Sequence, residues 1–200
     1  MIHIITPCSR PENLPLVYAS IPQDCHWVVV MDASTQPYQK SDGFHYFLNL
    51  VGLSGGKTEV GMPTVSVSYS QSSGMFGNLC RNQAIDELQA ADDDWIYFHD
   101  DDNLIHPDWR KGVEPYLESE IPMITWGQLE KDGSVRLPPP KEIWLNHIDT
   151  AMYMVRWGSL RNTRFEAKER DADGRLAVEL ASRHRHKIIE QSLCWYNVLR

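Results

Sequence analysis

Short apolar runs alternate with amphipathic stretches along the first half of the chain. This pattern predicts strands over residues 2–6, 27–31, 65–69 and 95–99, with helices over residues 11–20 and 78–90. The second and fourth of these strands are continuously apolar, which is typical of strands that helices cover on both faces. We therefore expect an α/β fold with βαβ units and a mostly parallel sheet flanked by helices.

The second half of the chain carries a different pattern. Residues 123–129 and 134–137 flank the sequence Lys-Asp-Gly, which predicts a β-hairpin. Residues 147–157 are expected to form another strand, residues 173–184 a helix, and residues 188–199 a last strand or short helix. The sheet should therefore have a mixed or antiparallel edge.

The predicted helix over residues 78–90 has two distinct faces. One face is apolar because four residues recur at helical spacing. These residues are Cys80, Ala84, Leu88 and Ala91. Asn78, Arg81 and Asn82 lie on another face. We therefore expect the start of this helix to be free for chemistry.

Two runs of three aspartates bracket the predicted strand that ends at residue 99. Ligands of an open α/β sheet bind beyond the carboxyl ends of its strands, which selects Asp100, Asp101 and Asp102 and leaves residues 92–94 as a solvated turn. If the backbone stays extended, the first and third of these carboxylates point to one side and the second to the other. Carboxylates suit Mg²⁺ or Mn²⁺, which complete their coordination with substrate phosphates. The alternative is a solvated acidic turn, although three adjacent carboxylates repel one another unless a cation is present.

Composition narrows the class of protein. The chain has 200 residues, of which 42% are hydrophobic, enough for the core of one domain. Its formal net charge of −8 argues against nucleic acid as a partner. Four scattered cysteines without a CxxC pair, and a start without a signal-like apolar run, predict a reduced, cytoplasmic protein. No stretch is long and apolar enough to predict a membrane span.

A glycine-rich segment over residues 52–63 resembles a phosphate-binding loop only superficially. The GxxxxGK[ST] pattern requires glycine at position 51, which is Val51 here, and Gly61 and Pro63 interrupt the helix that must follow. We therefore reject a P-loop. The segment itself is expected to be mobile, because it holds four glycines.

The stretch GNLCRNQAIDELQAADDDWIYFHDDDNLIHPDW resembles the core of family 2 and related glycosyltransferases with the GT-A fold, in which an Ala-Arg-Asn helix leads into a strand that ends in a DxD motif. Cys80 replaces the usual alanine and Gln83-Ala84 the usual x-Gly, while Arg81, Asn82 and the DxD remain. The segments IITPCSRPENL and WVVVMDAS are similar to the family's first and second strands.

The resemblance implies roles for residues of the first half. Thr6, Pro7 and Arg10 would line the nucleoside pocket, and Asp32 would accept a hydrogen bond from the base. Asp102 would contact the metal directly and Asp100 would join it, with Asp100 and Asp101 also near the substrate.

Each of these residues also has a plain structural role open to it. Asp32 is also suited to capping Ser34 in a turn. Arg10 is equally suited to a solvated loop before Pro11. Arg81 would touch the donor's diphosphate or sugar from its helix, or instead pair with Asp86 or another nearby carboxylate.

The second half carries the acceptor-side candidates. Asp149 opens HIDTAMYMVRW, which is similar to the family's acceptor-side strand. Asp171 aligns with the catalytic base of the family's ED-type motif and Asp173 with the next acidic position, although Arg170 replaces the expected glutamate. Both aspartates also suit the first turn or N-cap of a helix. Of the two, we favour Asp171 as the base, with Asp173 as the alternative.

Two further groups carry weaker signals. His184 and His186 would either join the metal site or form a solvated basic patch. Four aromatic side chains are able to cover the apolar faces of sugars, although most are expected in the core. They are Trp126, Trp144, Tyr153 and Trp157.

These observations predict one domain over residues 1–200, with a nucleotide-sugar-binding half over 1–110 and an acceptor-binding half over 111–200. We expect an inverting glycosyltransferase that moves a sugar from a nucleoside diphosphate donor, uridine-linked by family habit, to a carbohydrate or other hydroxyl acceptor with Mn²⁺ or Mg²⁺ as cofactor. The alternatives are a sugar nucleotidyltransferase and a non-catalytic sugar-binding module of the same fold.

Overall fold

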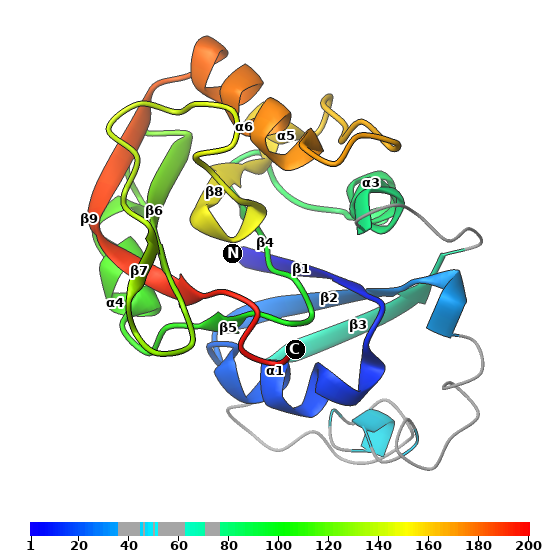
Figure 1. Cartoon of the computed structure of the whole chain (residues 1–200). Coiled ribbons are helices and arrows are strands. Elements are labelled where there is room, and N and C mark those ends of the chain that lie inside the picture. Colours follow the sequence, from blue (N-terminus) through cyan, green and yellow to red (C-terminus); the bar gives the residue numbers. More distant parts are fainter. Residues whose placement is uncertain (36–44, 46, 50, 52–62, 71–76) are drawn as a thin grey trace.

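The computed structural model describes residues 1–35, 45, 47–49, 51, 63–70 and 77–200 (Figure 1). The described residues form one sheet of nine strands in the order β3-β2-β1-β4-β8-β6-β9-β5, with β7 paired to β6. The strands are β1 (Ile2–Cys8), β2 (Cys25–Met31), β3 (Thr64–Tyr69), β4 (Trp95–Phe98), β5 (Leu104–Ile105), β6 (Met123–Leu129), β7 (Val135–Leu137), β8 (Tyr153–Arg156) and β9 (His186–Trp195). The helices are α1 (Leu14–Ser20), α3 (Asn78–Glu87), α4 (Trp109–Val113), α5 (Trp157–Leu160) and α6 (Ala172–Arg183), and two 3-10 turns, η1 (Pro11–Asn13) and η6 (Thr150–Met152), flank the site.

The four strands β3, β2, β1 and β4 are parallel neighbours. In Figure 1, α1 lies below these strands and α3 lies above them, which explains why β1, β2 and β4 are buried on both faces. The chain builds outward from β1 to β2 and β3, then returns to place β4 on the other side of β1. This reversal creates a crevice at the carboxyl ends of β1 and β4, where ligands of open α/β sheets bind.

The remaining strands form the mixed part of the sheet. β8 runs antiparallel between β4 and β6, and β9 runs parallel to β6. The predicted hairpin is confirmed, because β7 pairs antiparallel with β6. The α/β fold class, a mostly parallel sheet flanked by helices, is likewise confirmed.

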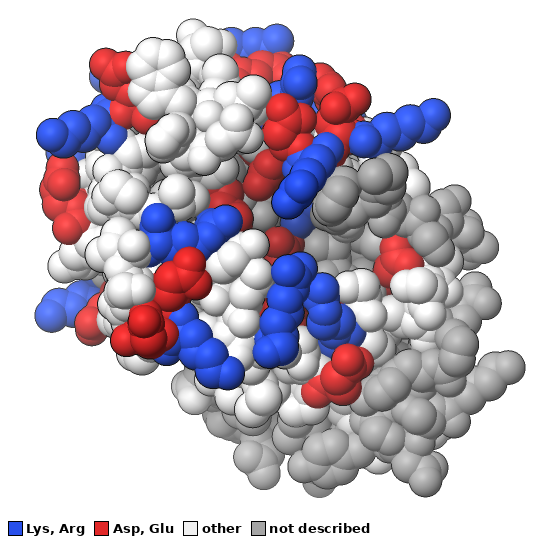
Figure 2. All heavy atoms as spheres, in the orientation of Figure 1, with Lys and Arg blue, Asp and Glu red and all other residues white. Residues whose placement is uncertain are grey.

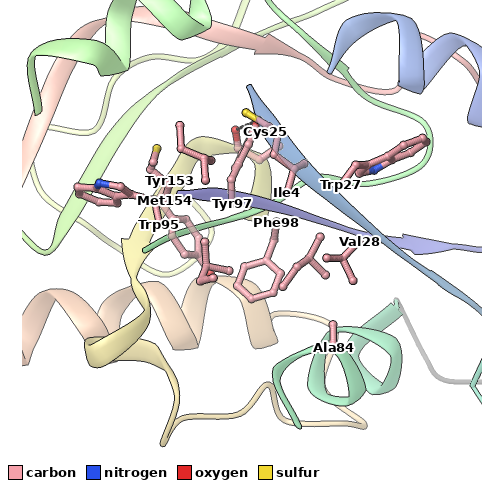
Figure 3. Close-up of a cluster of buried hydrophobic side chains, with 14 of the residues drawn as sticks. Ile4, Cys25, Trp27, Val28, Ala84, Trp95, Tyr97, Phe98, Tyr153 and Met154 are labelled. Atoms are coloured by element: carbon pink, nitrogen blue, oxygen red, sulfur yellow. Dashed lines mark hydrogen bonds between the residues drawn. The ribbon is translucent and has the colours of Figure 1, made fainter. Parts of the chain in front are cut away.

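Both halves of the chain contribute to one cluster of buried side chains. Figure 3 shows Ile4, Trp27 and Phe98 from the parallel strands together with Tyr153 and Met154 from β8, and all five are fully buried. The polar atom of the largest side chain is satisfied, since the Trp27 indole N–H donates to Thr6 Oγ1 at 2.9 Å. The strands whose carboxyl ends form the crevice are therefore held by a well-packed core.

Residues 147–157 do not form one strand as expected. The Asp149 carboxylate accepts a hydrogen bond from the Ala151 N–H at 3.1 Å and starts η6, so that strand β8 begins only at Tyr153. Strand β5 and helix α4 were not predicted, because two and five residues are too few to show a period.

Three other expectations concern the chain as a whole. All four cysteines are free and buried. Among the described helices, none is long and apolar enough to cross a membrane. The loop over residues 52–63, expected to be mobile, lies outside the described residues except for Pro63.

Candidate functional site

A pocket of about 500 Å³ opens at the carboxyl ends of β1, β2 and β4. Its walls come from the segment after β1, from the turn after β2, from the start of α3 and from the acidic turn after β4. The lining residues used below are Pro7, Ser9, Arg10, Asp32, Gly77, Asp100, Asp101, Asp102 and Arg200. We call this the first pocket.

A second pocket of about 620 Å³ lies beyond the acidic turn. It shares Asp100, Asp102 and Arg200 with the first pocket, and its other walls come from α3, the segment around η6, the start of α6 and the end of the chain. Figure 2 shows acidic atoms deep in a hollow near the middle of this face, with basic side chains around them. Asp100 and Asp102 therefore form the border between two adjoining pockets.

The acidic run is a turn rather than extended backbone, which corrects the expectation. The Asn103 N–H donates to the Asp100 carbonyl at 3.2 Å. The reason is topological, because the chain leaves β4 and next pairs with β9 through Leu104 and Ile105, on the far side of β8 and β6. The alternation of side chains along an extended strand therefore does not apply to these three carboxylates.

Asp101 turns back onto the segment after β1. Its carboxylate accepts hydrogen bonds from the backbone N–H groups of Ser9 and Arg10, both at 2.6 Å, and from Arg10 Nη1 at 2.8 Å. Asn13 Nδ2 donates to the Asp101 carbonyl at 3.0 Å. Burial raises the pKa of Asp101, and these bonds oppose the rise. Asp101 thus holds the wall of the first pocket in place.

Asp102 is buried, and charged side chains of both signs surround its carboxylate. Arg10 Nη1 and Arg200 Nε reach its Oδ2 at 3.1 and 2.9 Å. Burial, followed by the charges of Asp100 and Asp101, nevertheless raises the pKa of Asp102 to about 6. The two arginines therefore do not fully compensate the negative charge at the border.

Arg81 forms an ion pair with Asp100. Its guanidinium is buried, donates to Asp100 Oδ1 through Nη2 and donates to Asn78 Oδ1 at 3.0 Å through Nη1. The structure therefore shows the ion pair with a nearby carboxylate, while Asp86 pairs with Arg164 instead. Arg81 also lines the second pocket, so its contact with a substrate stays a prediction.

The start of α3 lies at both pockets, because Gly77 lines the first pocket while Asn78 and Arg81 line the second. Gly77 caps the helix with a φ of 75°, and a side chain there would lie 2.8 Å from Cβ of Pro7. Only glycine fits both the left-handed backbone and this close approach. Asn78 and Arg81 behind it are buried.

The polar face of α3 fixes the segment that leads to α6. Asn82 exchanges two hydrogen bonds of 2.8 Å with the backbone of Phe165. Asn78 Nδ2 donates to the carbonyls of Glu166 and Glu169 at 3.2 and 2.9 Å. These residues, which sequence reasoning gave no structural role, place the start of α6 against the second pocket.

Asp171 and Asp173 both line the second pocket, but their pKa values shift in opposite directions. Asp171 is the N-cap residue of α6 and its Oδ1 accepts from Arg175 Nε at 3.0 Å, which lowers its pKa. Burial, followed by the charge of Asp149, raises the pKa of Asp173 to about 6. Asp173 is thus the carboxylate with proton affinity near neutrality.

Asp149 lines the same pocket opposite α3. Burial and then the charge of Asp100 raise its pKa. Arg136 Nη1 lies 3.4 Å from Asp149 Oδ2, and the guanidinium stacks 3.5 Å above the Tyr196 ring. Asp149 therefore caps η6 and also lines the second pocket.

The first-half candidates divide in a similar way. Pro7 and Asp32 line the first pocket, and Asp32 Oδ1 also accepts from the Ser34 N–H at 2.8 Å, the turn contact considered above. Arg10 is held by Asp101 and Asp102 rather than solvated. Thr6 is fully buried, bonds to Trp27 and lines neither pocket.

The weaker candidates lie elsewhere. His184 and His186 line neither pocket, and no group of three metal-ligating side chains is found in the described part of the chain. Trp126, Tyr153 and Trp157 are buried in the core, whereas Trp144 is 60% exposed. The run at residues 92–94 forms a turn at the other end of β4, where Asp94 bonds to His3 and Asp92 to Arg161.

Arg200 and Arg136 were missed by sequence reasoning. Each is a single basic residue outside any motif, and its partner, Asp102 or Asp149, belongs to another element. No local pattern marks such a contact.

Comparison with known proteins supports the fold. No family model matches the chain, and no curated protein does. Among solved structures, residues 1–349 of S. aureus TarS superimpose with a TM-score of 0.70 at 15% identity, over 98% of this chain and 60% of that one. This chain therefore spans less than two thirds of the TarS structure.

Two other structures cover most of both chains. An inositol-1-phosphate CTP transferase from T. maritima has a TM-score of 0.52 at 11% identity, over 97% and 87% of the two chains. A 4-diphosphocytidyl-2C-methyl-D-erythritol synthase from Anaerococcus prevotii has 0.54 at 10% identity, over 93% and 86%. The chain has the GT-A-like fold of nucleotide-diphospho-sugar transferases.

Proposed function

We propose that the chain transfers a sugar, with inversion, from a nucleoside diphosphate donor to a hydroxyl of a carbohydrate acceptor. One observation carries the proposal: two pockets meet at Asp100 and Asp102, and the second holds a carboxylate, Asp173, whose pKa is about 6. A donor in the first pocket and an acceptor in the second would meet at this border. The arrangement would give each substrate a pocket of its own, with the base in the pocket of the acceptor.

The first pocket suits the nucleoside part of the donor. Its volume of about 500 Å³ lies within the usual range for small-ligand sites. Asp32 lies at its wall and is buried, which suits a carboxylate that accepts a hydrogen bond from a base. We take uridine as the first base to test.

Asp100 and Asp102 are the residues that would hold a divalent cation. One oxygen of each carboxylate contacts an arginine, and the other, Oδ2 of Asp100 and Oδ1 of Asp102, has no hydrogen-bond partner among the described residues. Two carboxylates completed by substrate phosphates are a usual ligand set for Mg²⁺ or Mn²⁺. When bound there, the ion would supply positive charge to the leaving diphosphate.

Asp173 is our choice for the base, in place of Asp171. An inverting displacement needs a base that takes the proton of the acceptor hydroxyl. With a pKa of about 6, Asp173 is ionised at neutral pH and still binds a proton well, whereas the pKa of Asp171 is lowered by its ion pair with Arg175. Arg81 donates to Asp100, and its positive charge also opposes the rise in the pKa of Asp173.

Sugar nucleotidyl transfer is the second candidate, and the names of the T. maritima and A. prevotii structures favour it. That reaction needs cations and glycines after the first strand to hold a triphosphate. Here the segment of Ser9, Arg10 and Pro11 contains no glycine and one basic residue, which is engaged by Asp101 and Asp102. A non-catalytic sugar-binding module would not require Asp173 to be ionised in the pocket.

Binding of UDP tests the donor site. We expect Mn²⁺ to tighten UDP binding by about tenfold or more, because the ion links the border carboxylates to the phosphates. Isothermal titration of the protein with UDP, in Mn²⁺ and then in excess chelator, measures the change. Equal affinity in both conditions would contradict the metal-assisted donor site.

A further inference from the structure

A third pocket, of about 820 Å³, is formed by one segment, residues 138–147, between β7 and η6. In Figure 1 this is the yellow-green loop that runs from β7 towards α6. Trp144 and Leu145 line the pocket and are 60% and 37% exposed, whereas Trp27, Trp95, Trp109 and Trp126 are fully buried. A solvent-facing indole in a pocket is typical of a binding surface.

The exposure of Trp144 does not come from a loosely held segment. A methyl group placed on Gly127 of β6 would lie 2.8 Å from Cδ of Pro139, and one on Gly174 of α6 would lie 3.1 Å from Cδ1 of Leu145. The segment is thus seated on β6 and on α6 at two points. Consecutive prolines at 138–140 restrict its backbone further.

The second and third pockets draw on the same segment of the chain but share no lining residue. Leu137, Asn146 and Ile148 line the second pocket, and eight other residues within 138–147 line the third. Leu145 packs on Gly174, the residue directly after Asp173. A saccharide chain whose hydroxyl lies at Asp173 would have to cross this segment, past Leu145, to reach Trp144.

The chemistry of the third pocket suits a sugar ring. The indole of Trp144 and the proline rings offer apolar surfaces for the C–H face of a sugar, and Lys141, Glu142 and His147 at the wall offer partners for hydroxyls. In Figure 2, uncharged atoms gather over this part of the molecule with charged side chains around them. An apolar floor with polar neighbours matches an amphipathic ligand.

We propose that the pocket around Trp144 binds a sugar ring of the acceptor beyond the ring that receives the transferred sugar. The acceptor is then an oligosaccharide or polysaccharide rather than a free monosaccharide. This inference rests on the proposed function of the second pocket. It assigns Trp144 as the residue that selects for acceptor length.

Binding of immobilised glycans tests the inference without any need for turnover. The probe is an array of gluco-, galacto- and manno-configured oligosaccharides, each in a series from the monosaccharide upward. We expect the wild-type protein to bind the longer members of at least one series. Trp144→Ala should weaken that binding by about tenfold, and Trp144→Phe, which keeps an aromatic face, by less.

Leu16→Ala is the matched control, because Leu16 is an exposed apolar residue of α1 that is 57% accessible and lines none of the three pockets. It should bind glycans as the wild type does. UDP binding and the thermal unfolding midpoint should be unchanged in both alanine variants, because Trp144 is already exposed.

Three outcomes would overturn the inference: no dependence on glycan length in the wild type, equal glycan binding by Trp144→Ala, or a protein ligand that needs Trp144 where no glycan does. Failure of the proposed function looks different. Length-dependent binding that needs Trp144, without any sugar transfer, would support the pocket and reject the transferase. Transfer to monosaccharides that is as efficient as transfer to longer acceptors would support the transferase and reject the role of the third pocket.

Discussion

Asp173→Asn is expected to lower the rate of sugar transfer by about a hundredfold or more while donor binding is retained. The asparagine keeps the size of the side chain and its acceptor for the Gly174 N–H, which now bonds to Asp173 Oδ1 at 2.8 Å. It removes only the ability to take a proton. Initial rates of transfer and titration with UDP measure the two effects separately.

Asp171→Asn is the control for this prediction, because Asp171 lines the same pocket two residues earlier. Its carboxylate pairs with Arg175 at the surface and is 27% exposed, so the loss of its charge should change turnover little. A large loss of turnover in Asp171→Asn with near-normal rates in Asp173→Asn would return the role of base to Asp171.

The pH dependence of the wild-type enzyme belongs to the same prediction. The raised pKa of Asp173, about 6, means that the free enzyme loses its base as the pH falls through 6. We therefore expect kcat/KM to be constant above this value and to fall below it. At saturating Mn²⁺, which would keep Asp102 ionised, the inflection should be absent from the residual activity of Asp173→Asn.

Asp102→Asn should abolish sugar transfer and the tightening of UDP binding by Mn²⁺, because it removes a carboxylate from the border of the two pockets. The fold should survive. The pKa of Asp102 is raised to about 6 by burial and by its acidic neighbours, so the ionised form costs the folded state up to about 3 kcal/mol above that pH. The free energy of unfolding should therefore rise in the variant above pH 6, and the gain should vanish in acid.

Asp92→Asn is the matched control, since it alters the other run of three aspartates, at the opposite end of β4. Asp92 is exposed and pairs with Arg161, so both UDP binding and stability should stay close to the wild type. Denaturant titration of the two variants gives the comparison. A marked loss of stability in metal-free Asp102→Asn would indicate that Asp102 serves the fold.

The sequence predicts the parts of this molecule that depend on local patterns. Continuous apolar runs indicated β2 and β4, and Lys-Asp-Gly indicated the hairpin of β6 and β7. The choice between the two aspartate runs followed from the rule for carboxyl ends of parallel strands. That choice agrees with the pockets, although the roles of the residues there stay predictions.

The rest depends on contacts between distant segments. Arg200 reaches Asp102 and Asn82 holds Phe165 only because the sheet brings these segments together. Thr6 was expected to line a nucleoside pocket, but it is fully buried, lines neither pocket and bonds to Trp27. The raised pKa of Asp173 depends on burial and on the charge of Asp149, and the local sequence reveals neither.

The identity of the released phosphate tests the central claim most directly. Phosphorus NMR can follow the protein with Mn²⁺ and a UDP-sugar plus an oligosaccharide acceptor in one tube, and UTP plus a sugar 1-phosphate in another. The account predicts that UDP appears in the first tube and that no pyrophosphate appears in the second. Pyrophosphate in the second tube, with the UDP-sugar unchanged in the first, would contradict glycosyl transfer and establish nucleotidyl transfer.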